Sequence, residues 1–374
     1  MYMALIVENI LRYVAHLFLQ LYGNVAVAAS YYVALANASL IGTLFIFTIP
    51  IATQSALKPY LLSRYSAQSN IIFLAITLVI LVFNHFYSGI FTIILFAISL
   101  IWFGTGLSFI KVMEKFRILI MCRLGSALVY TSIIILSIQL ELDETKIIHS
   151  ITLANFLGII IIEVFIIKTN FKALKLRSLL ANVCILIAKH RNYILNSFLL
   201  ILLLAIDRLL VSKNYADDEV VRYAIATSLC APLIILGNAY NIIFFTSVIS
   251  KRVRISRYSR LAQINLNACI NTILIIGCYY MAIRMGFFEE KLPPFKYIFF
   301  VVTYYWLYIN LQHVLFTSAA TSDYLFLKVL LSSILMICYF FISFIEIYMI
   351  IASFSMIFMI IFVLKHMRAQ HLDY

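Results

Sequence analysis

Residues 148–167 read IHSITLANFLGIIIIEVFII, and Glu163 is the only Asp, Glu, Lys or Arg among them. A helix that crosses a bilayer needs about 20 mostly apolar residues. The apolar residues here follow one another without the strict alternation that lipid-facing barrel strands show. This stretch therefore predicts a transmembrane helix with one acidic side chain inside it.

The composition extends this interpretation to the whole chain. Of its 374 residues, 64% are hydrophobic and 11% are charged, whereas soluble domains average about 45–50% apolar and about 25% charged residues. A soluble fold could not cover so much apolar surface with so few charges. Lipid is the alternative solvent, and it requires that backbone groups bond internally, as helices do.

The same length rule predicts further spans on both sides of residues 148–167. The twelve expected helices lie near residues 4–22, 26–50, 70–86, 89–110, 118–139, 148–167, 192–211, 221–249, 263–284, 296–319, 323–344 and 346–364. We therefore expect an all-α polytopic membrane protein with about twelve transmembrane helices in two six-helix lobes. The lobes are residues 1–167 and 192–374, and residues 168–191 between them are either an amphipathic cytoplasmic linker or an ordinary basic loop.

The net charge of +13 is distributed as in a membrane protein. Lys and Arg gather in short clusters between alternate apolar runs, such as residues 168–191 and 251–260, which is typical of cytoplasmic loops. This distribution argues against nucleic-acid binding. It predicts a multi-pass membrane protein with both termini in the cytoplasm.

The sequence contains no catalytic or metal-binding template. The six cysteines lie mostly within apolar runs without paired spacing, so they read as small buried hydrophobes. No glycine-rich phosphate loop, nucleophile elbow or large outer loop is present. We expect neither an enzyme nor a cofactor.

The first expected helix carries a polar stripe. Glu8, Arg12, His16 and Gln20 recur at every fourth residue, which keeps them on one slowly turning face of a helix. One interpretation is a cavity wall on which Arg12 offers a charged fork to phosphate. The other is a structural Glu8–Arg12 pair with a buried neutral His16.

Other ionisable residues lie within or near the expected spans, where each costs about 2.5–3.5 kcal/mol at the helix centre. Asp207 and Arg208 form either a functional pair or an interfacial pair that reaches water. Glu163 is either a protonated acid or an ion-coupling site. The remaining basic residues are candidates for a cationic lumen, or else interfacial anchors: Lys58, Arg123 and Arg222.

Three stretches resemble the Wzx-type flippases of lipid-linked oligosaccharides, in the superfamily of multidrug, oligosaccharidyl-lipid and polysaccharide exporters. They are AIDRLLVSKNYADDEVVRYAIATSL (205–229), LYGNVAVAASYYVALANASL (21–40) and FGTGLSFIKVMEKFRILIMCRLGSAL (103–128). The family usually has Gly two places before the Tyr that opens the second helix of each half, where this chain has Ser30 and Val221. The resemblance implies two helical lobes around a cationic central cavity, with Arg208 and Arg12 in its lining and Asp207 as a charge partner.

The resemblance also implies a function. The expected substrate is an undecaprenyl-pyrophosphate-linked oligosaccharide, flipped from the cytoplasmic to the outer leaflet by alternating access. We also expect coupling to a proton or sodium gradient that involves Glu8, His16, Asp207 or Glu163. The expected protein partner is a polysaccharide polymerase. The alternatives are a multidrug or cation antiporter of the same superfamily and an integral membrane O-antigen polymerase or ligase.

Overall fold

The computed structural model describes residues 2–43, 70, 73–81, 88–112, 115–167, 195–196, 198–249, 257–286, 291–317 and 325–369. Every element among these residues is a helix. The helices are α1 (Tyr2–Tyr22), α2 (Val25–Thr43), α5 (Ser88–Val112), α6 (Phe116–Gln139), α7 (Glu144–Ile161), the π-helix η2 (Ile162–Ile167), α9 (Asp217–Ile249), α10 (Arg257–Arg284), α11 (Phe295–Thr317), α12 (Leu325–Phe341) and α13 (Ile345–Ala369). Residues 73–81 and 198–214 are helical as well.

The chain forms two compact units. Unit 1 comprises Met1 and Ala34–Ile201, and unit 2 comprises Tyr2–Val33 and Leu202–Tyr374. Unit 2 thus includes α1 and the first half of α2, a grouping that the sequence did not predict. The lobe boundaries at residues 167 and 192 remain a prediction, because residues 168–194 lie outside the part of the chain that the structure describes.

Unit 1 is built on the packing of α5 against α6, α7 and η2. Its core includes Phe73, Trp102 and Phe103, and the Trp102 indole donates a hydrogen bond to Asn70 Oδ1 at 2.7 Å. At Gly158 a Cβ atom would lie 2.6 Å from the Phe103 ring. A small residue at this point therefore lets α5 and α7 approach closely, as is common between membrane helices.

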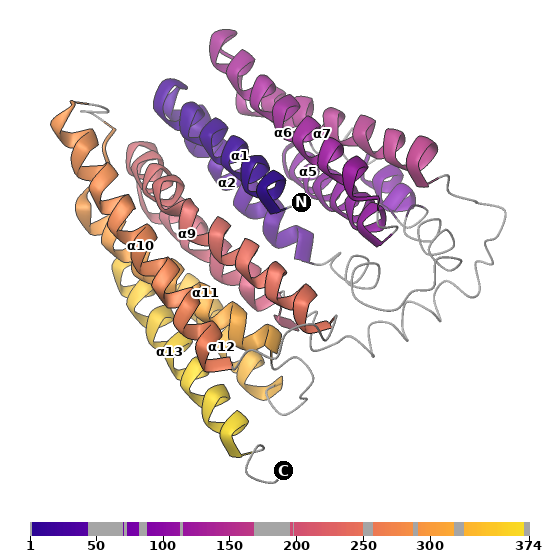
Figure 1. Ribbon diagram of the computed structural model, residues 1–374. Coiled ribbons are helices and arrows are strands. Elements are labelled where there is room, and N and C mark those ends of the chain that lie inside the picture. The colour runs from indigo at the N-terminus through magenta and orange to yellow at the C-terminus, as the bar shows by residue number, and fades with distance from the viewer. Residues whose placement is uncertain are drawn as a thin grey trace. The chain divides into compact units, whose positions relative to one another are not determined.

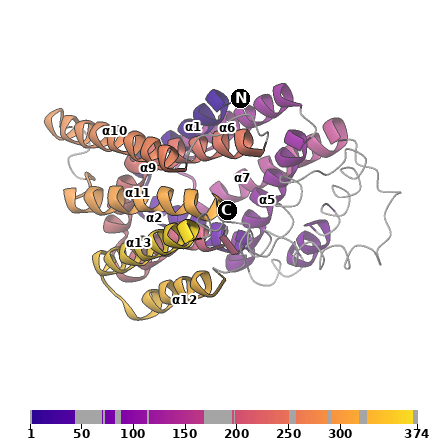
Figure 2. The same cartoon turned by 60° about the horizontal axis from the view of Figure 1, so that its bottom comes forward.

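Unit 2 is arranged around α9 and α11 (Figures 1 and 2). Helices α1, α10 and α11 pack against α9, α10 and α13 pack against α11, and α12 packs against α13. The sequential helices are joined by short connections, for example residues 23–24 and 342–344.

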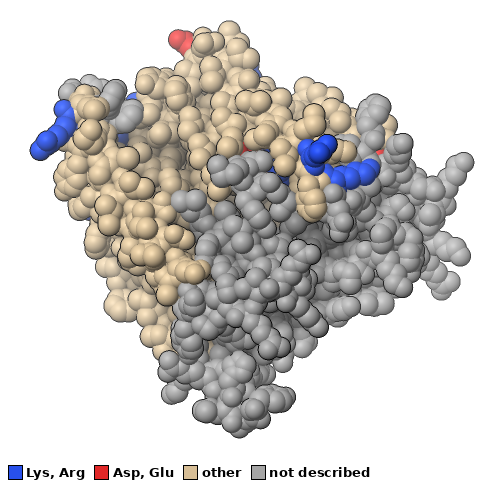
Figure 3. Space-filling model, in the orientation of Figure 1, with Lys and Arg blue, Asp and Glu red and all other residues tan. Residues whose placement is uncertain are grey.

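Seven of the described helices are long and apolar enough to span a membrane. They include all of α6 and most of α10, whose residues are largely exposed and apolar, such as Met121, Ile273 and Leu274. Where described residues are visible in Figure 3, charged side chains occupy only a few spots. The protein is therefore a polytopic α-helical membrane protein, because only lipid would solvate these apolar helix faces.

Candidate functional site

The two faces of α1 differ in polarity. Val7, Ile10, Val14 and Phe18 are exposed, and they recur at three- and four-residue spacing on one face. The polar stripe lies on another face: Glu8 and Gln20 are buried, and Arg12 and His16 are partly buried. The apolar face of α1 is thus available to lipid, and its polar face turns into unit 2.

The polar face of α1 is bonded within itself and to α9. Glu8 and Arg12 form an ion pair at 3.5 Å, and Gln20 Oε1 accepts a hydrogen bond from the Ser228 hydroxyl at 3.0 Å. The Glu8–Arg12 pair that the sequence suggested is therefore present. The ion pair by itself does not decide between a structural pair and a cavity wall.

Asp207 is buried in unit 2, with 1% of its surface exposed. Its Oδ2 atom accepts a hydrogen bond of 2.8 Å from the Tyr223 hydroxyl on α9. Its Oδ1 atom is buried and has no hydrogen-bond partner among the described residues. Burying a carboxylate costs free energy unless its oxygens accept hydrogen bonds. Only the Oδ2 atom of Asp207 does so, and its Oδ1 atom can still accept a hydrogen bond.

Arg208 is directed towards tyrosines of α2 and α11. Its Cζ atom lies 5.2 Å from the centre of the Tyr32 ring, within cation–π distance, and Tyr13 and Tyr305 lie within its electrostatic reach. Its Nε atom is buried without a partner in the described part of the chain. Arg208 therefore retains a hydrogen-bond donor for an anionic or hydroxyl-bearing ligand.

His16 joins the polar face of α1 to this group. Both Arg12 and Arg208 act electrostatically on its imidazole, and its ring centre lies 5.9 Å from that of Tyr31. We call Arg12, His16, Asp207, Arg208 and the tyrosines around Arg208 the Arg208 cluster. It combines cations from two helices that are far apart in sequence.

The tyrosines of the cluster were not predicted as site residues. Tyr304 and Tyr305 are buried within unit 2, and Tyr304 donates a 2.6 Å hydrogen bond to the Leu203 carbonyl, one turn before Asp207. The YYWLY run (304–308) reads from sequence as an interfacial belt or a packing feature. The contact of these tyrosines with Arg208 could not be predicted from the sequence, because Arg208 lies about a hundred residues earlier in the chain.

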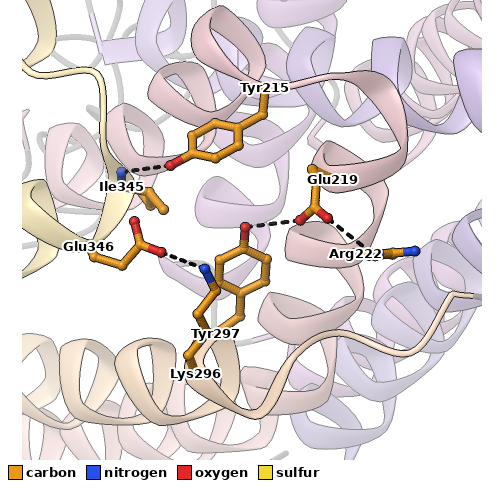
Figure 4. A network of polar contacts seen from close by, with 7 residues as sticks. All are labelled: Tyr215, Glu219, Arg222, Lys296, Tyr297, Ile345 and Glu346. Carbon is orange, nitrogen blue, oxygen red and sulfur yellow. Dashed lines mark hydrogen bonds and ion pairs between the residues drawn. The ribbon is translucent and has the colours of Figure 1, made fainter.

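Arg222 lies in a separate network at the end of α9 (Figure 4). Its Nη1 atom contacts Glu219 Oε1 at 3.0 Å, and Glu219 Oε2 accepts a hydrogen bond from the Tyr297 hydroxyl at 3.0 Å. In the same region Lys296 pairs with Glu346 at 2.9 Å, and Tyr215 Oη accepts a bond from the Ile345 amide. Arg222 thus pairs within α9, and its partner Glu219 joins α9 to α11 through Tyr297.

The other predicted site residues are not in the Arg208 cluster. Arg123 is partly buried on α6, and Glu163 is buried at the start of the π-helix; both belong to unit 1. Lys58 lies outside the described residues. Lys328, which is not among the predicted site residues, is fully buried on α12, and its Nζ atom has no partner among the residues described.

Comparisons with protein families, characterised proteins and solved structures find no match for this chain. The class is therefore defined by the fold and composition: an integral membrane protein of apolar helices with a buried charged cluster in unit 2. The described residues contain no group of three or more His, Cys, Asp or Glu that could hold a metal ion. What the Arg208 cluster offers chemically is charge, hydrogen-bond donors and aromatic faces.

Proposed function

We propose that the protein is a flippase that moves an undecaprenyl-pyrophosphate-linked oligosaccharide from the cytoplasmic to the outer leaflet of the bacterial inner membrane. The proposal includes about twelve spans in two six-helix lobes, cytoplasmic termini and no enzymatic step. The single observation that carries it is the buried, unused Nε donor of the partly buried Arg208, which lies over the Tyr32 ring.

A buried guanidinium in a membrane helix is costly and is retained where it has a task. Arg is suited to phosphate because its planar fork donates several hydrogen bonds in a fixed geometry. The tyrosines and His16 add polar groups and ring faces, which suit a saccharide that follows the phosphates. The guanidinium donors of Arg12 and Arg208 suit an anionic head group, whereas a cationic drug would have to bind the acids Glu8 and Asp207 beside them.

The transport step would follow from alternating access, in which one part of the helical assembly moves against another around the bound head group. Energy would come from an ion gradient, since a membrane potential supplies about 2.3 kcal/mol per charge per 100 mV. Asp207, with its unbonded Oδ1 atom, is an acid in the cluster that could exchange a proton or a sodium ion.

The proposal is tested by Arg208→Ala and Arg12→Ala in a host that depends on this chain for surface polysaccharide. We expect each variant to lower surface polysaccharide at least tenfold with unchanged abundance in the membrane, because each removes a phosphate-binding cation. Arg208→Lys should recover only part of the loss, since an ammonium lacks the fork. Arg284→Ala, which removes an exposed cation at the end of α10, is the matched control. Normal export from both cluster variants would refute the site.

A further inference from the structure

Helix α10 carries amide side chains on a face that it does not bury against unit 2. Its buried residues, such as Ala268 and Ile275, lie on the side that packs against α9 and α11. On another side Gln263, Asn267 and Asn271 recur at every fourth residue, which keeps them on one slowly turning face. Gln263 and Asn267 are exposed and Asn271 is partly buried. We call these three residues the amide stripe.

The amide stripe extends into the hydrocarbon region of the bilayer. The candidate span of α10 is Ala262–Arg284, and Ile273 is its midpoint. At about 1.5 Å per residue, Asn271 lies about 3 Å and Asn267 about 9 Å from this midpoint along the helix axis. The hydrocarbon reaches about 15 Å from the midplane, so both asparagines lie inside it, whereas Gln263 lies near its boundary.

Lipid tails cannot bond the amides of the stripe. Asn271 Nδ2 donates a 2.7 Å hydrogen bond to the Asn267 carbonyl, but the Asn267 side chain has no hydrogen-bond partner among the residues that the structure describes. An unbonded amide in hydrocarbon costs free energy. The exposed side chains of α13, such as Phe354 and Phe358, are apolar and are solvated by lipid alone. The amide stripe therefore favours contact with another polar helix face over contact with lipid.

A second copy of this chain has the matching chemistry. Two copies have the same orientation in the membrane, so their α10 helices meet in parallel across a two-fold axis and each residue meets its counterpart at the same depth. An amide both donates and accepts hydrogen bonds, so Asn267 and Asn271 can each pair with the same residue of the second copy. Residues 262–283 contain no Asp, Glu, Lys or Arg, so this pairing brings no like charges together within the membrane.

Gly277 gives the two helices room to approach each other. It is exposed, less than two turns beyond Asn271, and a Cβ atom at this position would meet no atom within 4 Å. Small residues at the contact between membrane helices let their backbones come close enough for asparagine side chains to bond across the interface.

We propose that the protein forms a parallel homodimer through α10, in which Asn267 and Asn271 bond to their counterparts and Gly277 lies at the closest approach of the two helices. The Arg208 cluster contains no residue of α10, so this inference does not depend on the proposed function. Normal export from the Arg208 variants would refute the flippase site without affecting the dimer, and a monomeric protein would leave the flippase proposal unchanged.

The test uses a full chain that keeps Cys278 as its only cysteine, because Cys278 is exposed one residue after Gly277. The membrane-permeant oxidant copper phenanthroline is added to cell membranes and to liposomes that contain the purified chain. We expect a disulfide-linked dimer in both. A chain whose only cysteine comes from Phe354→Cys, on the exposed face of α13, should give at least fivefold less dimer.

Three outcomes of this experiment would overturn the proposal. Equal amounts of dimer from the two cysteine positions would indicate random collision. Monomer alone in both preparations would mean that α10 faces lipid. A product of another size in cell membranes, without a dimer in the liposomes, would assign the amide stripe to a different membrane protein.

Variants of the stripe test which side chains hold the dimer together. Asn267→Leu combined with Asn271→Leu should lower the Cys278-linked dimer at least threefold, whereas Asn267→Gln combined with Asn271→Gln keeps the amides and should retain more of it. Equal dimer from the leucine variant and the parent chain would refute the role of the amides.

A matched pair of glycines tests the close approach. Gly277→Leu should lower the dimer at least threefold. Gly125→Leu, at a glycine of α6 whose added Cβ atom also meets no atom within 4 Å, should leave the dimer unchanged. Unchanged dimer in Gly277→Leu would exclude this face of α10 as the interface.

Discussion

The 2.8 Å hydrogen bond from Tyr223 to Asp207 is buried in the interior of unit 2. Removal of one partner of a buried hydrogen bond leaves the other unsatisfied, at a cost of about 1–3 kcal/mol. We therefore expect Tyr223→Phe to lower the free energy of unfolding by that amount. Thermal unfolding in detergent would measure it, with Tyr280→Phe as the control, because Tyr280 is more than half exposed.

Asp207 supplies the second half of this test. Replacing both partners with apolar side chains removes the unsatisfied group, so Tyr223→Phe combined with Asp207→Leu should cost less than the sum of the two single changes. Additive effects would mean that Tyr223 and Asp207 do not interact in the membrane-embedded protein.

Asp143 caps the first turn of α7 through its side chain, which accepts a 2.8 Å hydrogen bond from the Lys146 amide. Hydrogen bonding to the Lys146 side chain, and then to its amide, lowers the pKa of this exposed carboxyl below its ordinary value. A lowered folded-state pKa means that the stabilisation is complete above the unfolded-state pKa, about 3.9, and is lost as the pH falls through the folded-state value.

We expect Asp143→Ala to lower the melting temperature at pH 7, and the difference from the unmodified chain to shrink as the pH falls below about 4. Asp143→Asn retains a capping oxygen and should differ less from the unmodified chain at pH 7. A difference between Asp143→Ala and the unmodified chain that is constant from pH 7 to pH 3 would contradict the capping role.

At the scale of the helix, close contact between α5 and α7 depends on Gly158. A Cβ atom there would lie 2.6 Å from Phe103 Cε2, an atom of a buried ring with little room to move. We expect Gly158→Ala to destabilise the protein by about 1–3 kcal/mol, as overpacking of a core does. Thermal unfolding of the purified variant would measure this loss.

Gly125 of α6 provides the matched control, because an added Cβ atom meets no atom within 4 Å. Gly125→Ala should be neutral or stabilising by about 0.5–1 kcal/mol, since alanine loses less backbone freedom than glycine in a helix. Equal effects at the two glycines would show that helix propensity, and not the contact with Phe103, determines the result.

The elements also show what sequence patterns can and cannot predict. Runs of about twenty apolar residues predicted α6 and α11 to within two residues at each end, because lipid imposes a length and a composition on any span. The four-residue repeat predicted the polar face of α1 for a similarly local reason. The hydrogen bond of Tyr297 to Glu219 and the tyrosines around Arg208 depend on packing between distant segments, which no local pattern encodes.

At the scale of the molecule, the connections within unit 2 meet at one end. Lys291, before α11, donates a 2.9 Å hydrogen bond to the Leu21 carbonyl at the end of α1. Tyr297 reaches Glu219 at the start of α9, and Tyr215 reaches Ile345 at the start of α13. The residues that follow α1, precede α9, precede α11 and precede α13 therefore lie on the same side of the membrane, which the distribution of basic residues predicts to be the outer side.

This arrangement is tested by single cysteines placed in a chain whose six native cysteines have been replaced. We expect Asn24→Cys, Asp218→Cys, Met285→Cys and Phe344→Cys all to react with a membrane-impermeant maleimide added to intact spheroplasts, because all four positions are exposed near these helix ends. Arg254→Cys, in the basic stretch 251–260, should react only after the membrane is opened. Reaction of some of the four from outside and others only from inside would contradict the shared end. Reaction of all four positions only from inside would confirm that they share one side of the membrane but would reverse the proposed orientation. The substrate would then have to enter the Arg208 cluster from the leaflet opposite to the one proposed.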